Sequence, residues 1–407
     1  MYFIVNEISE RETSLIHLLN SLENIEEVSR LKGSEIHLIR APGRINLIGG
    51  HTDYNEGYVL PCTISMDVYV AACLNETRFI VVNSSELGQI QIFNLDNFEK
   101  TNNWIDYIKG VVHYLLTSGN QFGGFMAACN SNIPIGSGLS SSAAFEVAFT
   151  QTINSIFNLK LDKKTIANIS YLAETKYMAI SCGIMDQFIS SCGLKNHVMF
   201  LDCRPPYDNE FLLIPLDDDL KLIILDSNIT HSVKSFINLR KEECMRGLKI
   251  LQKSLKDKQA LRDIKIEELN KYQNRITPAN IRNRVKHVVN ENQRVLEAKE
   301  ALKEQNLEKL GELMYQSHLS LDKYYDVSCA ELNYIFNFLR KKSQTIGVRM
   351  TGAGKGGSLV AILKNKNLDT LFKEISKAYY NQFNLELKSY TCSIPNGAET
   401  IKKINYY

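Results

Sequence analysis

The sequence predicts an α+β protein built of two domains. Its 407 residues are more than one ordinary hydrophobic core accommodates. Segments rich in β-branched residues alternate with segments whose apolar residues recur at helical spacing. Two adjacent prolines within residues 203–210 indicate a connection between the halves. We therefore expect domains at residues 1–205 and 206–407, with mixed sheets and helices packed on them.

The elements of the first half follow in a regular order. Three segments of roughly alternating, β-branched residues predict strands at 68–75, 78–85 and 90–95. A helix is predicted at 104–119, where it ends at Gly119, and a further strand at 124–130. A loop of glycine and serine then enters a long helix within 133–159, and another helix, capped by Asp162, is predicted at 163–180.

The second half begins with a predicted strand at 220–228. About 80 residues of helical pattern follow, rich in Lys, Arg and Glu. Acidic residues are interspersed with the basic ones, which favours a solvated helix face over a nucleic-acid surface. The chain returns to strands around a glycine loop at 348–364 and to a helix at 370–383.

Composition narrows the class of protein. The chain is 44% hydrophobic and 23% charged, as is typical of globular proteins, and its net charge of +2 gives no reason to expect a nucleic acid or an anionic membrane as partner. No apolar run is long enough to cross a bilayer, and the first residues lack the pattern of a signal peptide. The nine cysteines show no CxxC pairing, which favours reduced thiols. We therefore expect a cytoplasmic protein.

Residues 134–143, PIGSGLSSSA, carry the clearest chemical signal. Their glycines let backbone N–H groups approach a ligand closely, and the helix that follows directs its positive end there. The segment is therefore a candidate phosphate cradle, although a simple helix cap explains a lone Gly/Ser turn equally well. It is not a Walker A loop because no Lys follows the last glycine.

Three further segments need an explanation. Residues 43–57, GRINLIGGHTDYNEG, are too polar for a core strand and too rich in glycine for a helix. Residues 350–358, MTGAGKGGS, form a second glycine loop, which a tight hairpin also explains. In GIMDQF a carboxylate, Asp186, stands among apolar residues, where a helix cap is commoner than a catalytic base.

These segments, taken together and in this order, resemble the galactokinase branch of the GHMP small-molecule kinases. The similarity runs from about Arg40 to the C-terminus and is carried by the motifs at 43–61, 134–143, 182–188 and 350–358. The resemblance implies a two-lobed enzyme that binds ATP and a sugar in the cleft between its lobes. Such an enzyme phosphorylates the anomeric hydroxyl of a hexose.

The resemblance assigns the catalytic roles to Asp186 and Arg44. Asp186 matches the family's aspartate, taken as general base toward the C1 hydroxyl, and Arg44 matches the arginine that stabilises charge near it. A guanidinium beside a carboxylate favours its ionised form and meets developing negative charge.

The resemblance also assigns the nucleotide site. It implies that ATP is bound by the triphosphate loop, which comprises Gly136, Ser137, Gly138, Leu139, Ser140, Ser141 and Ser142. Ser142 and Glu174 match the family's Mg²⁺ ligands, and both supply the hard oxygen donors that Mg²⁺ prefers. Trp104 and Tyr107 are expected beside the nucleotide or, alternatively, as core aromatics.

The sugar side departs from the family. His51 and Asp53 match residues that bind sugar hydroxyls, and Gly183 belongs to the same expected site. Gly50 stands where the family has a glutamate that reaches the C6 hydroxyl. The family's sugar-binding tyrosine is also missing, since Phe236 and Ile237 occupy that stretch. Losing a hydrogen bond to a charged group costs about 1.5–3 kcal/mol unless water substitutes.

Three functions are compatible with these departures. The chain is a galactokinase with a weakened C6 contact, a kinase for a C6-altered sugar such as galacturonate or L-arabinose, or a non-catalytic sugar sensor. The intact phosphate loop, with Glu174 and Asp186, favours catalysis, and galactose is the favoured substrate. We expect a monomer or weak homo-oligomer whose partners are a sugar, ATP and Mg²⁺. Lys355, where the family usually has Phe, either adds charge near phosphate or points to solvent.

Overall fold

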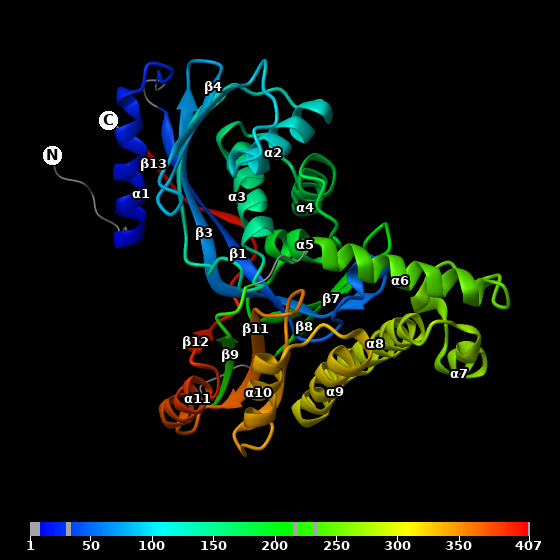
Figure 1. Ribbon diagram of the computed structural model, residues 1–407. Coiled ribbons are helices and arrows are strands. Elements are labelled where there is room, and N and C mark those ends of the chain that lie inside the picture. The colour runs from blue at the N-terminus through cyan, green and yellow to red at the C-terminus, as the bar shows by residue number, and fades with distance from the viewer. Residues whose placement is uncertain (1–8, 30–33, 215–218, 231–233, 406–407) are drawn as a thin grey trace.

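The N-terminal lobe is organised around a six-stranded sheet (Figure 1). The structure, a computed structural model, describes residues 9–29, 34–214, 219–230 and 234–405. In spatial order the strands are β13 (Glu399–Asn405), β1 (Glu35–Asn46), β3 (Pro61–Asn75), β6 (Gly124–Ser131), β4 (Phe79–Ser84) and β5 (Ile90–Asn94). All neighbours are antiparallel except β4 and β6.

Helices cover both faces of this sheet. On one face lies α1 (Glu10–Asn20), which begins with a capping box between Ser9 and Glu12. The opposite face is covered by α2 (Ile105–Thr117), α3 (Ser141–Ile156) and α4 (Lys163–Leu172), as Figure 1 shows. Asp162 caps α4 by accepting a hydrogen bond from the Thr165 amide at 2.7 Å.

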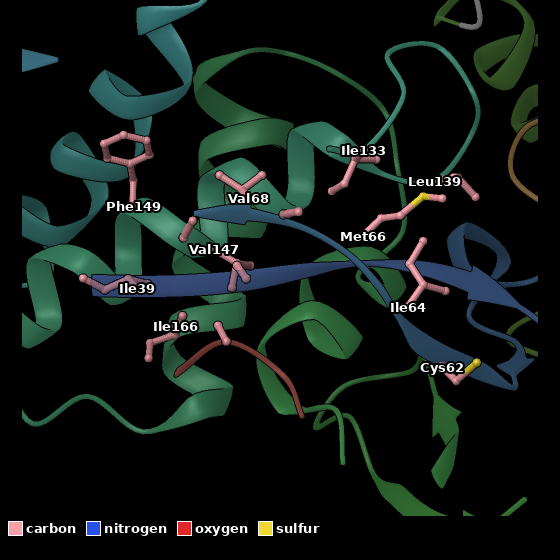
Figure 2. Close-up of a cluster of buried hydrophobic side chains, with 14 of the residues drawn as sticks. Ile39, Cys62, Ile64, Met66, Val68, Ile133, Leu139, Val147, Phe149 and Ile166 are labelled. Carbon is pink, nitrogen blue, oxygen red and sulfur yellow. The ribbon is translucent and has the colours of Figure 1, made fainter. Parts of the chain in front are cut away.

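The core of this lobe lies between the sheet and α3 and α4. Figure 2 shows part of it, in which Ile39 and Val68 of the strands lie in one cluster with Val147 of α3 and Ile166 of α4. All four side chains are at most 1% exposed. This burial provides the main stabilisation of the lobe that carries the phosphate loop.

The C-terminal lobe contains a four-stranded antiparallel sheet. Its order is β10 (Thr345–Met350), β11 (Ser358–Lys364), β9 (Leu220–Asp226) and β12 (Lys388–Cys392). Alternate residues of β9 face two different cores, since Ile223 packs with the C-terminal helices and Ile224 packs with the N-terminal cluster. The helices of this lobe are α8 (Ala279–Lys303), α9 (Leu307–Ser320), α10 (Ala330–Leu339) and α11 (Leu368–Phe383).

A third, smaller sheet and three further helices complete the fold. The sheet consists of β2 (Tyr58–Val59), β7 (His197–Asp202) and β8 (Asn209–Leu213). The helices are α5 (Met185–Cys192), α6 (Lys234–Gln252) and α7 (Ile266–Tyr272). The short helical turns are η1 (Ser21–Asn24), η2 (Asp53–Asn55), η3 (Ala173–Tyr177), η4 (Leu261–Asp263), η5 (Gln273–Arg275) and η6 (Leu321–Tyr325), of which η3 and η6 are π-helical.

The α+β class is confirmed, and the predicted strands and helices of the first half correspond to observed elements, although β3 begins at Pro61, seven residues before the predicted strand at 68–75. The helix predicted at 163–180 is wrong only at its end: α4 ends at Leu172, the π-helical turn η3 continues to Tyr177, and residues 178–180 are not helical. The domain boundary after residue 205 stays a prediction, but two pairings cross it: β8 pairs with β7, and β13 pairs with β1.

The structure also tests what the sequence predicted about the cysteines and about membrane-spanning segments. All nine cysteines are free thiols. Within the described part of the chain, no helix combines the length and the apolar character needed to span a membrane.

Candidate active site

Two glycine loops pack against each other at the centre of the molecule. The phosphate loop connects β6 to α3, and its Gly136 and Gly138 take positive φ angles of 77° and 76°. The second loop joins the antiparallel strands β10 and β11, so it is a hairpin, but its seven residues, 351–357, make it longer than a tight turn. Ser358 Oγ donates to the Ser137 carbonyl at 2.9 Å, and a Cβ on Gly352 would lie 2.7 Å from the Gly138 carbonyl. Both loops border a cavity of about 250 Å³.

Arg44 and Asp186 form a two-pronged ion pair beside this cavity. Arg44 lies near the end of β1, and Asp186 lies in the first turn of α5. Arg44 Nε donates to Asp186 Oδ1 at 2.7 Å and Nη2 donates to Oδ2 at 2.6 Å. Arg44 Nη1 also donates to the Gly138 carbonyl at 2.6 Å, and Ser140 Oγ donates to Asp186. The pair is thereby tied directly to the phosphate loop.

Ser142 and Glu174 also meet. Ser142 Oγ donates to Glu174 Oε1 at 2.9 Å across the gap between α3 and η3. Burial raises the pKa of Glu174, and the negative charge of Asp186 raises it further. Among the described residues no cation pairs with Glu174, so a divalent cation would relieve this repulsion and the hard oxygen donors fit Mg²⁺. No group of three or more His, Cys, Asp or Glu side chains suited to a metal occurs in the described ranges.

Trp104 and Tyr107 line a second cavity, of about 250 Å³, next to the phosphate loop. Ser141, Ser142 and Phe145 of α3 form its opposite wall. Trp104 packs edge-on against Phe145 with 6.1 Å between ring centroids, and its Nε1 is buried without a hydrogen-bond partner in the described residues. Trp104 also packs against the N-terminal core, so both interpretations of this aromatic residue apply.

Asp53 and Gly183 are in direct contact on the sugar side. A Cβ on Gly183 would lie 2.2 Å from Asp53 Oδ2, so only glycine leaves room for that carboxylate. Burial raises the pKa of Asp53 to about 6, and the charge of Asp186 adds to the effect. Both residues border a cavity of about 400 Å³ that Lys241 and Cys244 of α6 also line. The loop 43–57 thus reaches the cleft between the lobes.

His51 lies behind Asp53 in an apolar and aromatic surrounding. Its Nδ1 is 2.7 Å from the Tyr54 hydroxyl, which is itself 2.9 Å from the Tyr325 hydroxyl. Burial lowers the pKa of His51 to about 3, and the charges of His287 and Arg349 act in the same direction. Its Nε2 is buried and makes no hydrogen bond of good geometry among the described residues, although the backbone of Ala353 is close enough to oppose the lowering of the pKa.

Gly50 is held by its backbone and faces a buried arginine. Its amide donates to Glu291 Oε1 at 3.1 Å, and its carbonyl lies 3.0 Å from His287 Nε2. A Cβ on Gly50 would lie 2.5 Å from Arg349 Nη2. Arg349 Nη1 in turn donates to the Asn46 carbonyl at 2.6 Å, two residues beyond Arg44. A side chain at position 50 would therefore displace a buried guanidinium.

Sequence reasoning missed these partners of Gly50. The interpretation of the charged helical region as a solvated face is wrong for part of α8, because His287 and Glu291 are completely buried. Charged or polar residues four apart lie on one helix face, and these two share the face of Val288 and Val295. The apolar stripe at helical spacing is the signal that would have placed them inside.

Two positions where the family pattern breaks have definite partners. Phe236 of α6 lies under Arg240, with the guanidinium carbon 4.4 Å from the ring centroid. Lys355 Nζ donates to Asp326 Oδ1 at 3.0 Å, and Asp326 also pairs with Arg240. The Lys355 side chain therefore forms an exposed ion pair, which is a third outcome beside the two expected.

Comparisons with known proteins agree with this geometry. The GHMP kinases N terminal domain matches residues 106–194, the GHMP kinases C terminal family matches residues 298–381, and the galactokinase galactose-binding signature matches residues 29–74. The structure of Methanococcus jannaschii mevalonate kinase shares the fold, with a TM-score of 0.62 and 19% identity over 90% of this chain and 99% of that one. The fold and the paired glycine loops thus define a GHMP kinase.

Closer relatives identify the branch. A Thermosipho africanus galactokinase is 38% identical over 89% of this chain and 99% of its own length, and a Thermotoga maritima galactokinase is 36% identical over the same shares. The crystal structure of Lactococcus lactis galactokinase complexed with galactose has a TM-score of 0.88 and 30% identity, over 95% of this chain and 99% of that one. The chain belongs to the galactokinase family.

Proposed function

We propose that this chain is an ATP-dependent galactokinase, which transfers the γ-phosphoryl group of ATP to the anomeric hydroxyl of galactose and releases galactose 1-phosphate and ADP. One observation carries the proposal: the Arg44–Asp186 pair lies where the phosphate loop meets the sugar-side residues Asp53 and Gly183. The names of the curated relatives support the same reaction.

Asp186 is the proposed general base. One of its carboxylate oxygens accepts the proton of the C1 hydroxyl or orients that hydroxyl for attack on the γ-phosphorus. Arg44 holds the carboxylate through two hydrogen bonds and directs positive charge toward the transferring group. Because phosphoryl transfer depends chiefly on positioning and electrostatics, the rigidity of this pair is the main contribution of the chain.

The nucleotide binds between the two glycine loops. Residues 136–142 present backbone N–H groups at the start of α3 to the phosphates, and the pocket beside Trp104 and Tyr107 receives the base. Ser142 and Glu174 would hold Mg²⁺, which neutralises phosphate charge when bound. The unpartnered Trp104 Nε1 is available to an acceptor on the base.

Galactose binds against the loop 43–57. Asp53 accepts hydrogen bonds from sugar hydroxyls, and His51 Nε2 forms a further hydrogen bond with one of them. Gly183, which has no side chain, leaves room for the Asp53 carboxylate. Gly50 contributes its backbone only. The lack of a carboxylate at position 50 favours a second candidate, a kinase for a sugar with a C6 carboxylate such as galacturonate, because it removes like-charge repulsion of that group.

A sugar panel tests the proposal. ADP release is measured with ATP, Mg²⁺ and galactose, galacturonate or L-arabinose, with Asp186→Asn as the inactive control. We expect kcat/KM for galactose to exceed the other two by roughly 10-fold or more, because without a glutamate at position 50 the site selects the C6 group chiefly by shape. A preference for galacturonate would select the second candidate. Folded protein that binds galactose but releases no ADP with any sugar would select the sensor.

We further infer that the protein works in the cytoplasm as a monomer or weak homo-oligomer, without nucleic-acid or membrane partners. The small net charge of +2 supports this, since it provides no attraction to polyanions.

A further inference from the structure

The first turn of α5 presents two polar side chains in different directions. Asp186 pairs with Arg44 next to the phosphate loop. The next residue, Gln187, is fully buried and is directed at Glu174 and at Glu146, a residue of α3. Neither Gln187 nor Glu146 has a part in the proposed reaction.

A single amide nitrogen connects two carboxyl groups. Gln187 Nε2 lies 2.5 Å from Glu174 Oε2 and 3.2 Å from Glu146 Oε2. A side-chain amide has two N–H donors, so it can donate one hydrogen bond to each of the two carboxyl groups. All three side chains are at most 6% exposed, and water therefore does not readily replace these bonds.

These bonds leave the two oxygens of Glu174 with different partners. Oε2 accepts from Gln187 and, at 3.5 Å, lies near the Cys182 thiol, whereas Oε1 accepts only from Ser142 in the described residues. Glu146 is four residues after Ser142 in α3, so both lie on the same helix face. Two helices thus hold Glu174 from two sides.

We propose that Gln187 is a positioning residue for phosphoryl transfer, whose amide ties Glu174 to Glu146 and keeps Glu174 Oε1 directed at Ser142. This inference rests on the proposed metal-binding role of Ser142 and Glu174. Partners that orient a metal-binding carboxylate typically contribute roughly 10- to 100-fold to metal affinity. Because Gln187 follows Asp186 directly, one helical turn sets the positions of both the base and the metal-binding carboxylate.

Gln187→Met tests the inference, since Met has similar length but no amide. Mn²⁺ binding to the complex with a non-hydrolysable ATP analogue is measured by electron paramagnetic resonance, and galactose binding by calorimetry. We expect Mn²⁺ affinity to fall roughly 10- to 100-fold while galactose affinity stays within about twofold. Unchanged Mn²⁺ affinity in the folded variant overturns the inference.

Matched variants separate positioning from general packing. Ser190→Ala removes another buried hydrogen bond of α5, to the Pro42 carbonyl, and should leave Mn²⁺ affinity unchanged. An equal loss in Ser190→Ala overturns the inference. Should Gln187→Met not fold, Glu146→Gln and Glu146→Leu replace it. Glu146→Gln keeps an acceptor for the Gln187 amide and should bind Mn²⁺ nearly normally, whereas Glu146→Leu lacks this acceptor and should bind Mn²⁺ more weakly. Equal Mn²⁺ affinity of the two variants would contradict the inference.

Glu174→Gln distinguishes this inference from the proposed function. Unchanged Mn²⁺ affinity in Glu174→Gln overturns the metal-binding role itself, and the inference with it. A loss in Glu174→Gln together with normal binding in Gln187→Met overturns only the inference about Gln187.

Discussion

The phosphate-transfer side and the sugar side of the site differ in how their polar groups are satisfied. On the transfer side, Arg44, Asp186 and Ser142 each have a hydrogen-bond partner within 2.9 Å. On the sugar side, Asp53 is half-buried at the cavity wall without an ion pair in the described residues, and His51 Nε2 makes no hydrogen bond of good geometry there. The Arg44–Asp186 pair is therefore organised by the chain alone, whereas the sugar side has bonding capacity left for a ligand.

The two sides of the site should therefore differ in their effect on the stability of the protein. Unmade hydrogen bonds of buried groups destabilise a protein by about 1–3 kcal/mol each, so the free sugar side lowers stability and a bound sugar restores it. The Arg44–Asp186 pair needs no such completion, because its electrostatic preorganisation is already present before substrates bind. Elsewhere on the transfer side, Glu174 has no cation among the described residues, and Glu146 Oε1 and Gln187 Oε1 are buried without a hydrogen-bond partner there. Substitutions on the phosphate-transfer side should therefore affect turnover. Substitutions on the sugar side should affect stability and sugar binding.

The largest effect is expected at Asp186. Asp186→Asn keeps the shape but removes the acceptor charge, so phosphoryl transfer should fall by about 10²- to 10⁴-fold while nucleotide binding and folding persist. Steady-state kinetics and a thermal melt measure this. Turnover above about a tenth of the wild type would exclude Asp186 as the base.

A smaller loss is expected from Ser142→Ala and Glu174→Ala. Ser142 Oγ and Glu174 Oε1 are 2.9 Å apart, and each variant removes one of these two oxygen donors. Both variants should therefore raise the Mg²⁺ concentration needed for half-maximal turnover by roughly 10-fold or more. Titration of activity with Mg²⁺ at fixed ATP provides the test. A variant with the wild-type titration curve would have no part in holding the metal.

Asp53 should impose a pH dependence on stability. Its carboxyl titrates near 3.8 when unfolded and at about 6 when folded, so the folded protein binds more protons between these values. The free energy of unfolding therefore falls as pH rises from about 4 to 6, and it should fall roughly 1–3 kcal/mol less in Asp53→Asn. Urea unfolding at several pH values measures the difference between the two proteins. Parallel curves would contradict the burial of this carboxyl.

Gly50→Ala should destabilise the fold through Arg349. The new Cβ would lie 2.5 Å from Arg349 Nη2, and overpacking of this kind costs about 1–3 kcal/mol. Gly123→Ala is the matched control, because its Cβ meets only Phe157 Cε1 at 3.8 Å. Equal urea midpoints for both variants would show that Arg349 moves aside without cost, and Gly50→Glu would then become a clean test of sugar choice.

The smallest effect is expected at Lys355. Its ion pair with Asp326 is partly exposed, and such pairs contribute about 0–1 kcal/mol. Lys355→Met should therefore leave KM for ATP within about twofold and shift the thermal midpoint little. A several-fold increase in KM for ATP at low salt would instead place this ammonium beside the phosphates.

The sequence allowed the motifs and most local elements to be predicted, and long-range features were missed for physical reasons. Residues 35–46 were not predicted as a strand because they contain Pro42 and Gly43, yet β1 accommodates them through a register shift between Pro42 and Arg44. Likewise, the π-helical turn that carries Glu174 has no recognisable local pattern. The motifs placed Arg44 and Asp186 together correctly, although their roles stay predictions.

The parts of the site that were missed come from packing between distant segments. Glu291, His287 and Arg349 surround Gly50 from α8 and β10, more than 230 positions along the chain. Neither helical spacing nor a local motif specifies which buried polar groups meet across such separations. Gln187 lies inside a recognised motif, but only the structure shows which carboxyl groups it bonds.

The pairing of β13 with β1 has a consequence for biosynthesis. β1 carries Arg44, and its outer neighbour in the sheet comes from residues 399–405. During translation, at about 5–20 residues per second, the N-terminal lobe therefore keeps an unpaired edge at β1 until residues 399–405 have been made. Such an edge is a template for wrong pairing, so nascent chains of this protein should depend on chaperones more than their balanced composition suggests.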